Sequence, residues 1–92
     1  MKEISKYVMR LAHEYRRQGL DNWSKCLRLA WAKYRVAIKG TTVTIRFWKV
    51  STGELREAVV RRLNHPEGGV IRFIEQCNGY TQWRSFRLDA VE

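Results

Sequence analysis

Tryptophan and arginine side chains are the groups in this sequence whose types and spacing could support chemistry. Trp48 and Trp83 each lie opposite the more apolar face of a strand-like segment, and Arg46 and Arg87 accompany them. Aromatic rings stack on nucleobases for roughly 1–3 kcal/mol per base, and the planar guanidinium group binds phosphate through paired hydrogen bonds. If the two segments share a sheet, these residues form a surface that binds nucleic acid. The alternative is that helices cover this face and bury both tryptophans.

Other basic side chains extend this predicted nucleic-acid-binding set. Three of them lie on a predicted helix, where basic residues either contact phosphate or are simply solvated. The complete predicted set is Arg46, Trp48, Arg72, Trp83, Arg84, Arg87, Lys25, Arg28 and Arg35. Because most of these contacts would be made to phosphate, we expect binding to weaken steeply as salt is added.

Arg84 is unusual in this set because it falls on the apolar face of its strand-like segment. Burying a charged group is costly unless the group has a partner. We therefore expect Arg84 to lie at the rim of the fold, to pair with an acidic side chain or to bind an anionic ligand. The acidic candidates are Glu57, Glu75 and Asp89.

Residues that commonly carry catalysis or bind metals do not form a recognisable motif. His13 lies on a predicted helix and His65 in a predicted loop, and neither has the spacing of a metal-binding or hydrolytic motif. Cys26 is expected to be a small buried apolar residue and Cys77 a turn residue, both reduced. The sequence therefore predicts a protein that is not an enzyme, with no catalytic residue, cofactor or metal.

The net charge of +9 is the strongest global feature of these 92 residues. It favours a polyanionic partner, with nucleic acid first and an acidic protein second, although a high charge also serves solubility alone. We see no secretory signal, and no apolar run approaches the roughly 20 residues of a membrane span. We therefore expect a cytoplasmic protein that does not bind membranes.

The first 39 residues are predicted to form two antiparallel helices. Apolar residues recur at helical spacing across residues 2–17, and Gly19 ends that helix. Asp21 or Asn22 is expected to cap the second helix, and Gly40 to end it. The apolar stripe of the second helix, expected to be core, is Trp23, Leu27, Ala30, Trp31 and Tyr34.

The remaining residues alternate in a strand-like pattern. We expect strands at residues 41–50, 55–62, 70–76 and 81–88, with residues 90–91 either adding a fifth or trailing off. Hairpin turns are predicted at residues 51–53 and 77–79, and a loop at residues 64–69.

Together these elements predict a single α+β domain over residues 1–92. It consists of an N-terminal two-helix hairpin (residues 1–39) and a four- to five-stranded antiparallel SH3/Sm-like small barrel (residues 41–91). Short strands joined by tight hairpins suit such a barrel.

Three segments resemble a known family. Residues 83–91, Trp-Arg-Ser-Phe-Arg-Leu-Asp-Ala-Val, resemble the Arg-x-Phe-Arg-Leu-Asp-Arg-Ile segment that closes the core of WYL domains, with Ala90 in place of the last arginine. Residues 44–50 with Gly53 are similar to the first hairpin of WYL-like, Sm-type SH3 barrels in small proteins of gut bacteria and their phages. Residues 20–35 resemble the helical leader that often precedes such barrels. The resemblance implies a small barrel that senses a ligand or nucleic acid.

Three functions remain open from the sequence. The first is a basic, non-enzymatic nucleic-acid-binding or regulatory accessory domain, for DNA or RNA. The second is a protein-interaction module that docks an acidic partner. The third is a WYL-like sensor of a small ligand or anion, bound near Arg84 and Arg87. The sequence does not indicate the oligomeric state.

Overall fold

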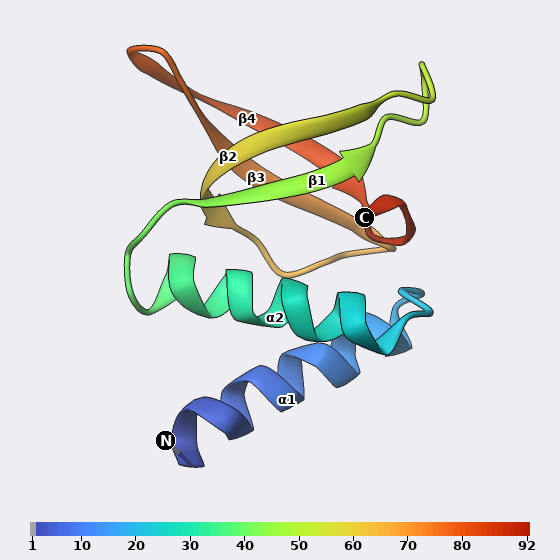
Figure 1. Ribbon diagram of the computed structural model, residues 1–92, viewed down its shortest axis with the longest axis vertical. Helices are drawn as coiled ribbons and strands as arrows, with labels where there is room; N and C mark the ends of the chain where they lie inside the picture. Colours follow the sequence, from blue (N-terminus) through green and yellow to red (C-terminus); the bar gives the residue numbers. More distant parts are fainter. Residues whose placement is uncertain (1) are drawn as a thin grey trace.

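The computed structural model describes the backbone of residues 2–92 and the side chains of residues 6–92. Two helices lie below a twisted four-stranded antiparallel sheet (Figure 1). The elements are α1 (Lys2–Arg17), α2 (Trp23–Ala37), β1 (Val43–Trp48), β2 (Leu55–Leu63), β3 (Val70–Cys77), β4 (Tyr80–Arg87) and a short 3₁₀ helix, η1 (Leu88–Ala90). The predicted α+β class, helix pair and four strands are therefore confirmed.

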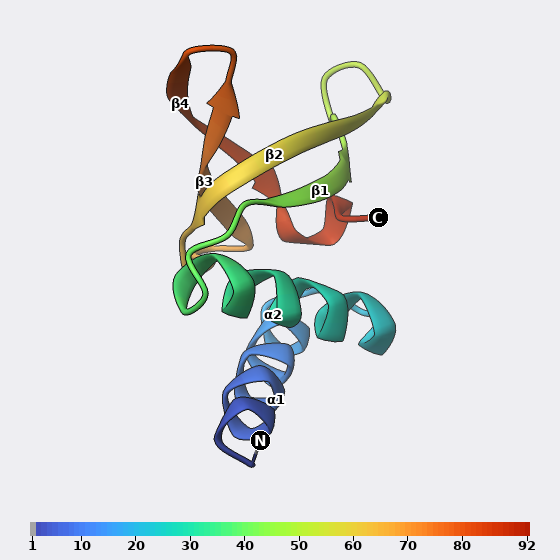
Figure 2. The same cartoon turned by 60° about the vertical axis from the view of Figure 1, so that its left-hand side comes forward.

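The sheet is open, with strand order β1-β2-β3-β4, so β1 and β4 are its two edges. Its twist brings the ends of these edge strands towards each other near the C-terminus (Figure 2). The chain after β4 returns to β1 through a single bridge between Phe47 and Val91, and the Glu92 amide donates to the Arg46 carbonyl at 2.9 Å. Residues 90–91, a possible fifth strand, thus contribute one bridge, and Leu88 belongs to η1 rather than to β4.

Local signals in the sequence set the helix ends. Gly19 follows α1 with a φ of +122°, a conformation that side chains with a Cβ rarely adopt. Asn22 caps α2, because its Oδ1 accepts a hydrogen bond from the Lys25 amide at 3.1 Å. The short connection between these two residues folds the helices back on each other.

The core lies between α2 and the inner face of the sheet. Alternation along each strand places Ile45, Val60 and Phe73 on this face, where they are at most 5% exposed. Phe47, Phe73 and Phe86 form an aromatic cluster with ring centroids 4.9–5.9 Å apart. Apolar burial of this size is the main stabilising contribution in a small domain.

Helix α1 packs on α2, on the side away from the sheet (Figures 1 and 2). Val8, Ala12 and Tyr15 fill this second interface and are almost fully buried. Neither helix within residues 2–92 is long and apolar enough to cross a membrane.

Lys33 joins α2 to the end of β2. Its ammonium group donates a hydrogen bond to the backbone carbonyl of Leu63. Burial lowers the pKa of Lys33 below its ordinary value, and the nearby positive charge of Arg62 lowers it further. The sheet and α2 are therefore held together by a polar contact as well as by the core.

The predicted burial of Trp31 is wrong. Tyr34 is buried and Trp23 half-buried, but 43% of Trp31 is exposed. Helix α2 is covered by α1 on one side and by the sheet on another, with Cys26 and Ala30 in the buried centre. Trp31 lies beyond Ala30 around the helix and faces the open junction between α2 and β1.

Candidate nucleic-acid interface

A groove runs between the two edge strands, where β1 and β4 come close without pairing. It has a volume of about 800 Å³, and we call it the edge-strand groove. Its lining residues are Phe47, Trp48, Lys49, Val50, Ser51, Arg56, Val70, Trp83, Arg84, Ser85, Phe86 and Arg87. Four of the nine predicted binding residues therefore line one groove: Trp48, Trp83, Arg84 and Arg87.

The two groove tryptophans are half exposed, Trp48 at 47% and Trp83 at 48%. The helices cover the opposite face of the sheet, so they do not bury either ring. The guanidinium carbon of Arg72 lies 5.4 Å from the centre of the Trp83 ring, in cation–π contact. Arg72 therefore supports the orientation of Trp83 from the neighbouring strand β3.

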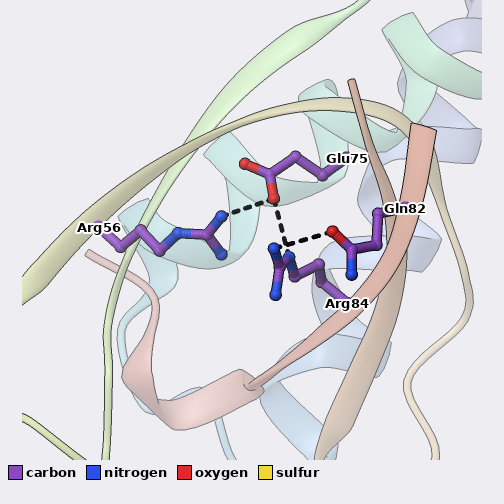
Figure 3. A network of polar contacts seen from close by, with 4 residues as sticks. All are labelled: Arg56, Glu75, Gln82 and Arg84. Atoms are coloured by element: carbon purple, nitrogen blue, oxygen red, sulfur yellow. Dashed lines mark hydrogen bonds and ion pairs between the residues drawn. The ribbon is translucent and has the colours of Figure 1, made fainter. Parts of the chain in front are cut away.

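Two arginines that line the groove, Arg56 and Arg84, belong to a charged network around Glu75 (Figure 3). Glu75, only 8% exposed, accepts hydrogen bonds on one oxygen from Arg56 at 2.5 Å and from Arg84 at 3.1 Å. Arg84 also donates to the Gln82 side chain at 2.9 Å. Of the three acidic residues that the sequence offered as partners of Arg84, the structure therefore shows that Glu75 is the one bound.

The register of the sheet creates this network. Glu75 pairs across the ladder with Gln82 on β4 and with Val60 on β2, so Arg84 and Arg56 approach it from the two neighbouring strands. Two guanidinium groups around one carboxylate leave a net positive charge. Neither Arg56 nor Arg84 uses its Nη1 in a hydrogen bond to any residue that the structure describes. These donors are free to bind an anion that enters the groove.

Arg87 lies at the outer side of the groove and pairs with Asp89. The two hydrogen bonds, at 3.1 Å and 2.7 Å, are parallel, which is typical of a guanidinium with a carboxylate. Both side chains are more than half exposed, so the pair contributes about 0–1 kcal/mol to stability. A phosphate group in the groove can therefore compete with Asp89 for Arg87.

The remaining predicted residues lie along a second depression, between α2 and β1, which we call the α2–β1 trough. Lys25, Arg28 and Arg46 line one end of it, and Arg28, Trp31 and Arg35 line the other. Arg46 bonds to Glu57 at 2.8 Å and lies 3.7 Å from Glu92. The hydrogen bond to Glu57, with the charges of Glu57 and Glu92, raises the pKa of Arg46 above its ordinary value.

Three residues of these sites are not among those predicted from the sequence. Lys49 and Arg56 line the groove, and Trp31 lines the trough. A signal for Arg56 was available, because it alternates onto the same face as Ala58 and Val60. Like Arg84, Arg56 is a charged residue on an apolar face and therefore needs a partner.

The histidines and cysteines lie apart from both depressions. His13 packs on Trp23 with ring centroids 4.9 Å apart, and His65 lies 3.8 Å from Glu14. A hydrogen bond from Gln18 lowers the pKa of Glu14, and Arg17 and His65 act in the same direction. Within the described residues, no group of three or more His, Cys, Asp or Glu side chains is placed to hold a metal ion.

Comparison of the chain with protein-family models, with curated proteins and with solved structures found no match. The residues and geometry of the two depressions therefore carry the functional assignment proposed below.

Proposed function

We propose that this protein is a non-enzymatic nucleic-acid-binding or regulatory accessory domain that binds its ligand in the edge-strand groove. The observation that carries the proposal is the exposure of Trp48 and Trp83 in one groove with basic residues. Exposed aromatic rings grouped with basic side chains are typical of interaction sites, and a base can stack on a ring face that the protein leaves open. Arg84, Arg87 and Lys49 would bind the phosphate groups.

The resemblance to WYL-like, Sm-type barrels supports the same function. We propose that the sheet, η1 and the Phe47–Val91 bridge correspond to a small barrel whose remaining seam is the edge-strand groove. The WYL-like barrels that the chain resembles occur in gut bacteria and their phages, and on this resemblance the protein would act in the cytoplasm. In this interpretation the ligand binds where the barrel is incompletely closed.

The experiment that tests the proposal is fluorescence anisotropy with labelled single-stranded DNA, duplex DNA and RNA at low and physiological salt. The test variant combines Trp48→Ala with Trp83→Ala. Its control is Tyr80→Ala, which removes an aromatic ring that is 58% exposed outside the groove. At about 1 kcal/mol for each lost stacking contact, the double variant should bind about 30-fold more weakly.

The control variant should bind like the wild-type protein, and both variants should keep their circular dichroism spectra. Binding that occurs only at low salt, and that the tryptophan substitutions leave unchanged, would refute the proposal. That result would indicate nonspecific charge attraction and would favour an acidic protein as the partner.

A further inference from the structure

We infer that the edge-strand groove and the α2–β1 trough form one continuous track for a single strand of nucleic acid. This inference rests on the proposed function and specifies its ligand. The groove supplies two stacking rings, and the trough supplies a third ring with a row of basic side chains.

The trough is continuous along α2. Its two parts, of about 210 Å³ and 510 Å³, share Arg28, Ala32 and Thr44 in their lining. The basic residues along it run from Lys25 to Arg35, which is about 15 Å of helix at 1.5 Å per residue. A polyanionic chain lying along α2 therefore meets positive charge over the whole length of the trough.

The outer face of β1 connects the trough to the groove. Thr44, Arg46 and Trp48 alternate onto this face and are all exposed. Thr44 belongs to the trough and Trp48 to the groove, and Arg46 lies between them, about 7 Å from each along the strand. A strand of nucleic acid that leaves the groove past Trp48 thus reaches the trough without crossing an uncharged surface.

Two carboxylates lie at this connection, and both interact with Arg46. Glu57 bonds to its Nε, and Glu92 approaches its Nη1. The Arg46–Glu57 pair is exposed, so phosphate can replace Glu57 at small cost. Glu92 is half-buried, and its Oε2, which faces Arg46, is buried, so Glu92 stays in place beside the track. Among the described residues, Glu92 is the one acidic side chain in the lining of the trough or the groove. Glu57, Glu75 and Asp89 lie outside the lining and pair with its arginines.

Trp31 gives the trough a stacking surface of its own. Its ring is 43% exposed and packs edge-on against Tyr34, with centroids 5.9 Å apart. This contact fixes the ring at the side of the trough, next to Arg28 and Arg35. Three exposed tryptophans therefore lie along one path that otherwise carries mainly positive charge.

These features favour a single strand over a duplex. The faces of paired bases are hidden by stacking in a duplex, whereas unpaired bases can stack on aromatic side chains. The molecule is 37 Å in its longest dimension, which limits the track to about eleven stacked nucleotides at 3.4 Å each. A four-nucleotide strand would occupy only the groove, and a twelve-nucleotide strand would fill the whole track.

The test compares oligothymidylates of four and twelve nucleotides, with tryptophan fluorescence quenching as the readout for both. The trough variant combines Arg28→Gln with Arg35→Gln. The control combines Arg61→Gln with Arg62→Gln, which lowers the net charge equally on a part of β2 that lines neither depression. A longer strand can bind a short site in more positions, which raises its apparent affinity, so the variants are compared on strands of the same length.

Loss of two phosphate contacts should reduce binding of the twelve-nucleotide strand by about 25-fold at 0.1 M salt, from a slope of about 0.7 per contact. The same variant should bind the four-nucleotide strand as the control does. Equal affinities of the two variants for the longer strand would overturn the inference, as would equally tight binding of a twelve-base-pair duplex.

The results distinguish failure of the proposed function from failure of the continuous track. If the four-nucleotide strand binds and depends on Trp48 and Trp83, the proposed function stands whatever the trough variant shows. If neither strand quenches the tryptophan fluorescence, both the proposed function and the track are refuted.

Discussion

Substitution of Glu75 by glutamine should make the protein less stable and at the same time tighten its binding of nucleic acid. Glu75 lies almost fully buried between Arg56 and Arg84 and accepts a hydrogen bond from each. Glutamine keeps the shape and one acceptor oxygen but removes the negative charge. Both guanidinium groups then lose their only charged partner within the described residues.

The loss of stability follows from the burial of the network. Removing one partner of a fully buried ion pair costs about 3–5 kcal/mol, but the side chains of Arg56 and Arg84 are 27% and 41% exposed. Water can solvate them in part, and glutamine still accepts a hydrogen bond. We therefore expect Glu75→Gln to cost about 1–2 kcal/mol, which lowers the Tm of a domain of this size by roughly 5–15 °C.

The gain in affinity follows from the position of the same two arginines in the groove. If releasing them adds one phosphate contact, the salt slope for a single strand rises by about 0.7, which gives about 5-fold tighter binding at 0.1 M salt. Thermal unfolding and fluorescence anisotropy of the same preparation measure both effects. The charge-matched control is Glu67→Gln, an exposed residue in the loop before β3.

The control should change both quantities little. A folded Glu75→Gln protein that binds nucleic acid no more tightly than Glu67→Gln would refute the placement of phosphate beside Arg56 and Arg84. A variant as stable as the wild type would show that the network contributes nothing to the fold.

Two further predictions concern buried groups outside the edge-strand groove and the α2–β1 trough. The Tyr15 hydroxyl is buried without a hydrogen-bond partner among the described residues, so Tyr15→Phe should leave stability at pH 7 unchanged or raise it by about 1 kcal/mol. Burial raises the pKa of the Tyr15 hydroxyl, so the unfolded chain loses this proton at a lower pH than the folded protein, and stability falls as the pH rises above about 10. Urea unfolding at pH 7 and pH 11 measures this fall. Tyr15→Phe should remove part of it, whereas the exposed control Tyr80→Phe should not. Burial also raises the pKa of Cys26, whereas Cys77 is partly exposed, so iodoacetamide should modify Cys77 first in the native protein. Equal rates for the two thiols before unfolding would contradict the burial of Cys26.

The helices and strands were predictable because each depends on local periodicity. Helical spacing and the Asn22 cap define α2, and an Asn-Gly turn defines the hairpin between β3 and β4. Errors occurred where tertiary contacts decide the outcome. Trp31 fits the apolar stripe of α2 as well as Ala30 does, and only the placement of α1 and the sheet shows that its side of the helix stays open.

The residues of the candidate site could be predicted from the sequence, but their assembly into one groove could not. Alternation identified Trp48, Trp83 and the exposed arginines from their own strands. Their assembly into one groove depends on the twist that brings β1 towards β4, and the sequence does not encode this in any local pattern. The partner of Arg84 likewise depends on the register that places Glu75 beside it.

The distribution of charge suggests that the two halves of the protein contribute differently to binding. Four acidic residues of the C-terminal half are engaged by arginines of the same half, namely Glu57, Glu75, Asp89 and Glu92. Among the described side chains of the helices and the connection between them, two are acidic: Glu14 on α1 and Asp21 in the connection. The proposed track would therefore obtain most of its phosphate attraction from α2 and most of its stacking from the sheet.

The salt dependence of binding should therefore differ between the tryptophan variant and the arginine variant. Affinity from phosphate contacts falls linearly with salt on a logarithmic scale, whereas stacking is nearly independent of salt. The Trp48→Ala/Trp83→Ala protein should therefore lose affinity by the same factor at every salt concentration, with its slope unchanged. The Arg28→Gln/Arg35→Gln protein should show a slope lower by about 1.4 and should approach the wild type near 1 M salt. Parallel slopes for both variants would mean that α2 attracts the ligand only from a distance, and the groove would then be the whole binding site.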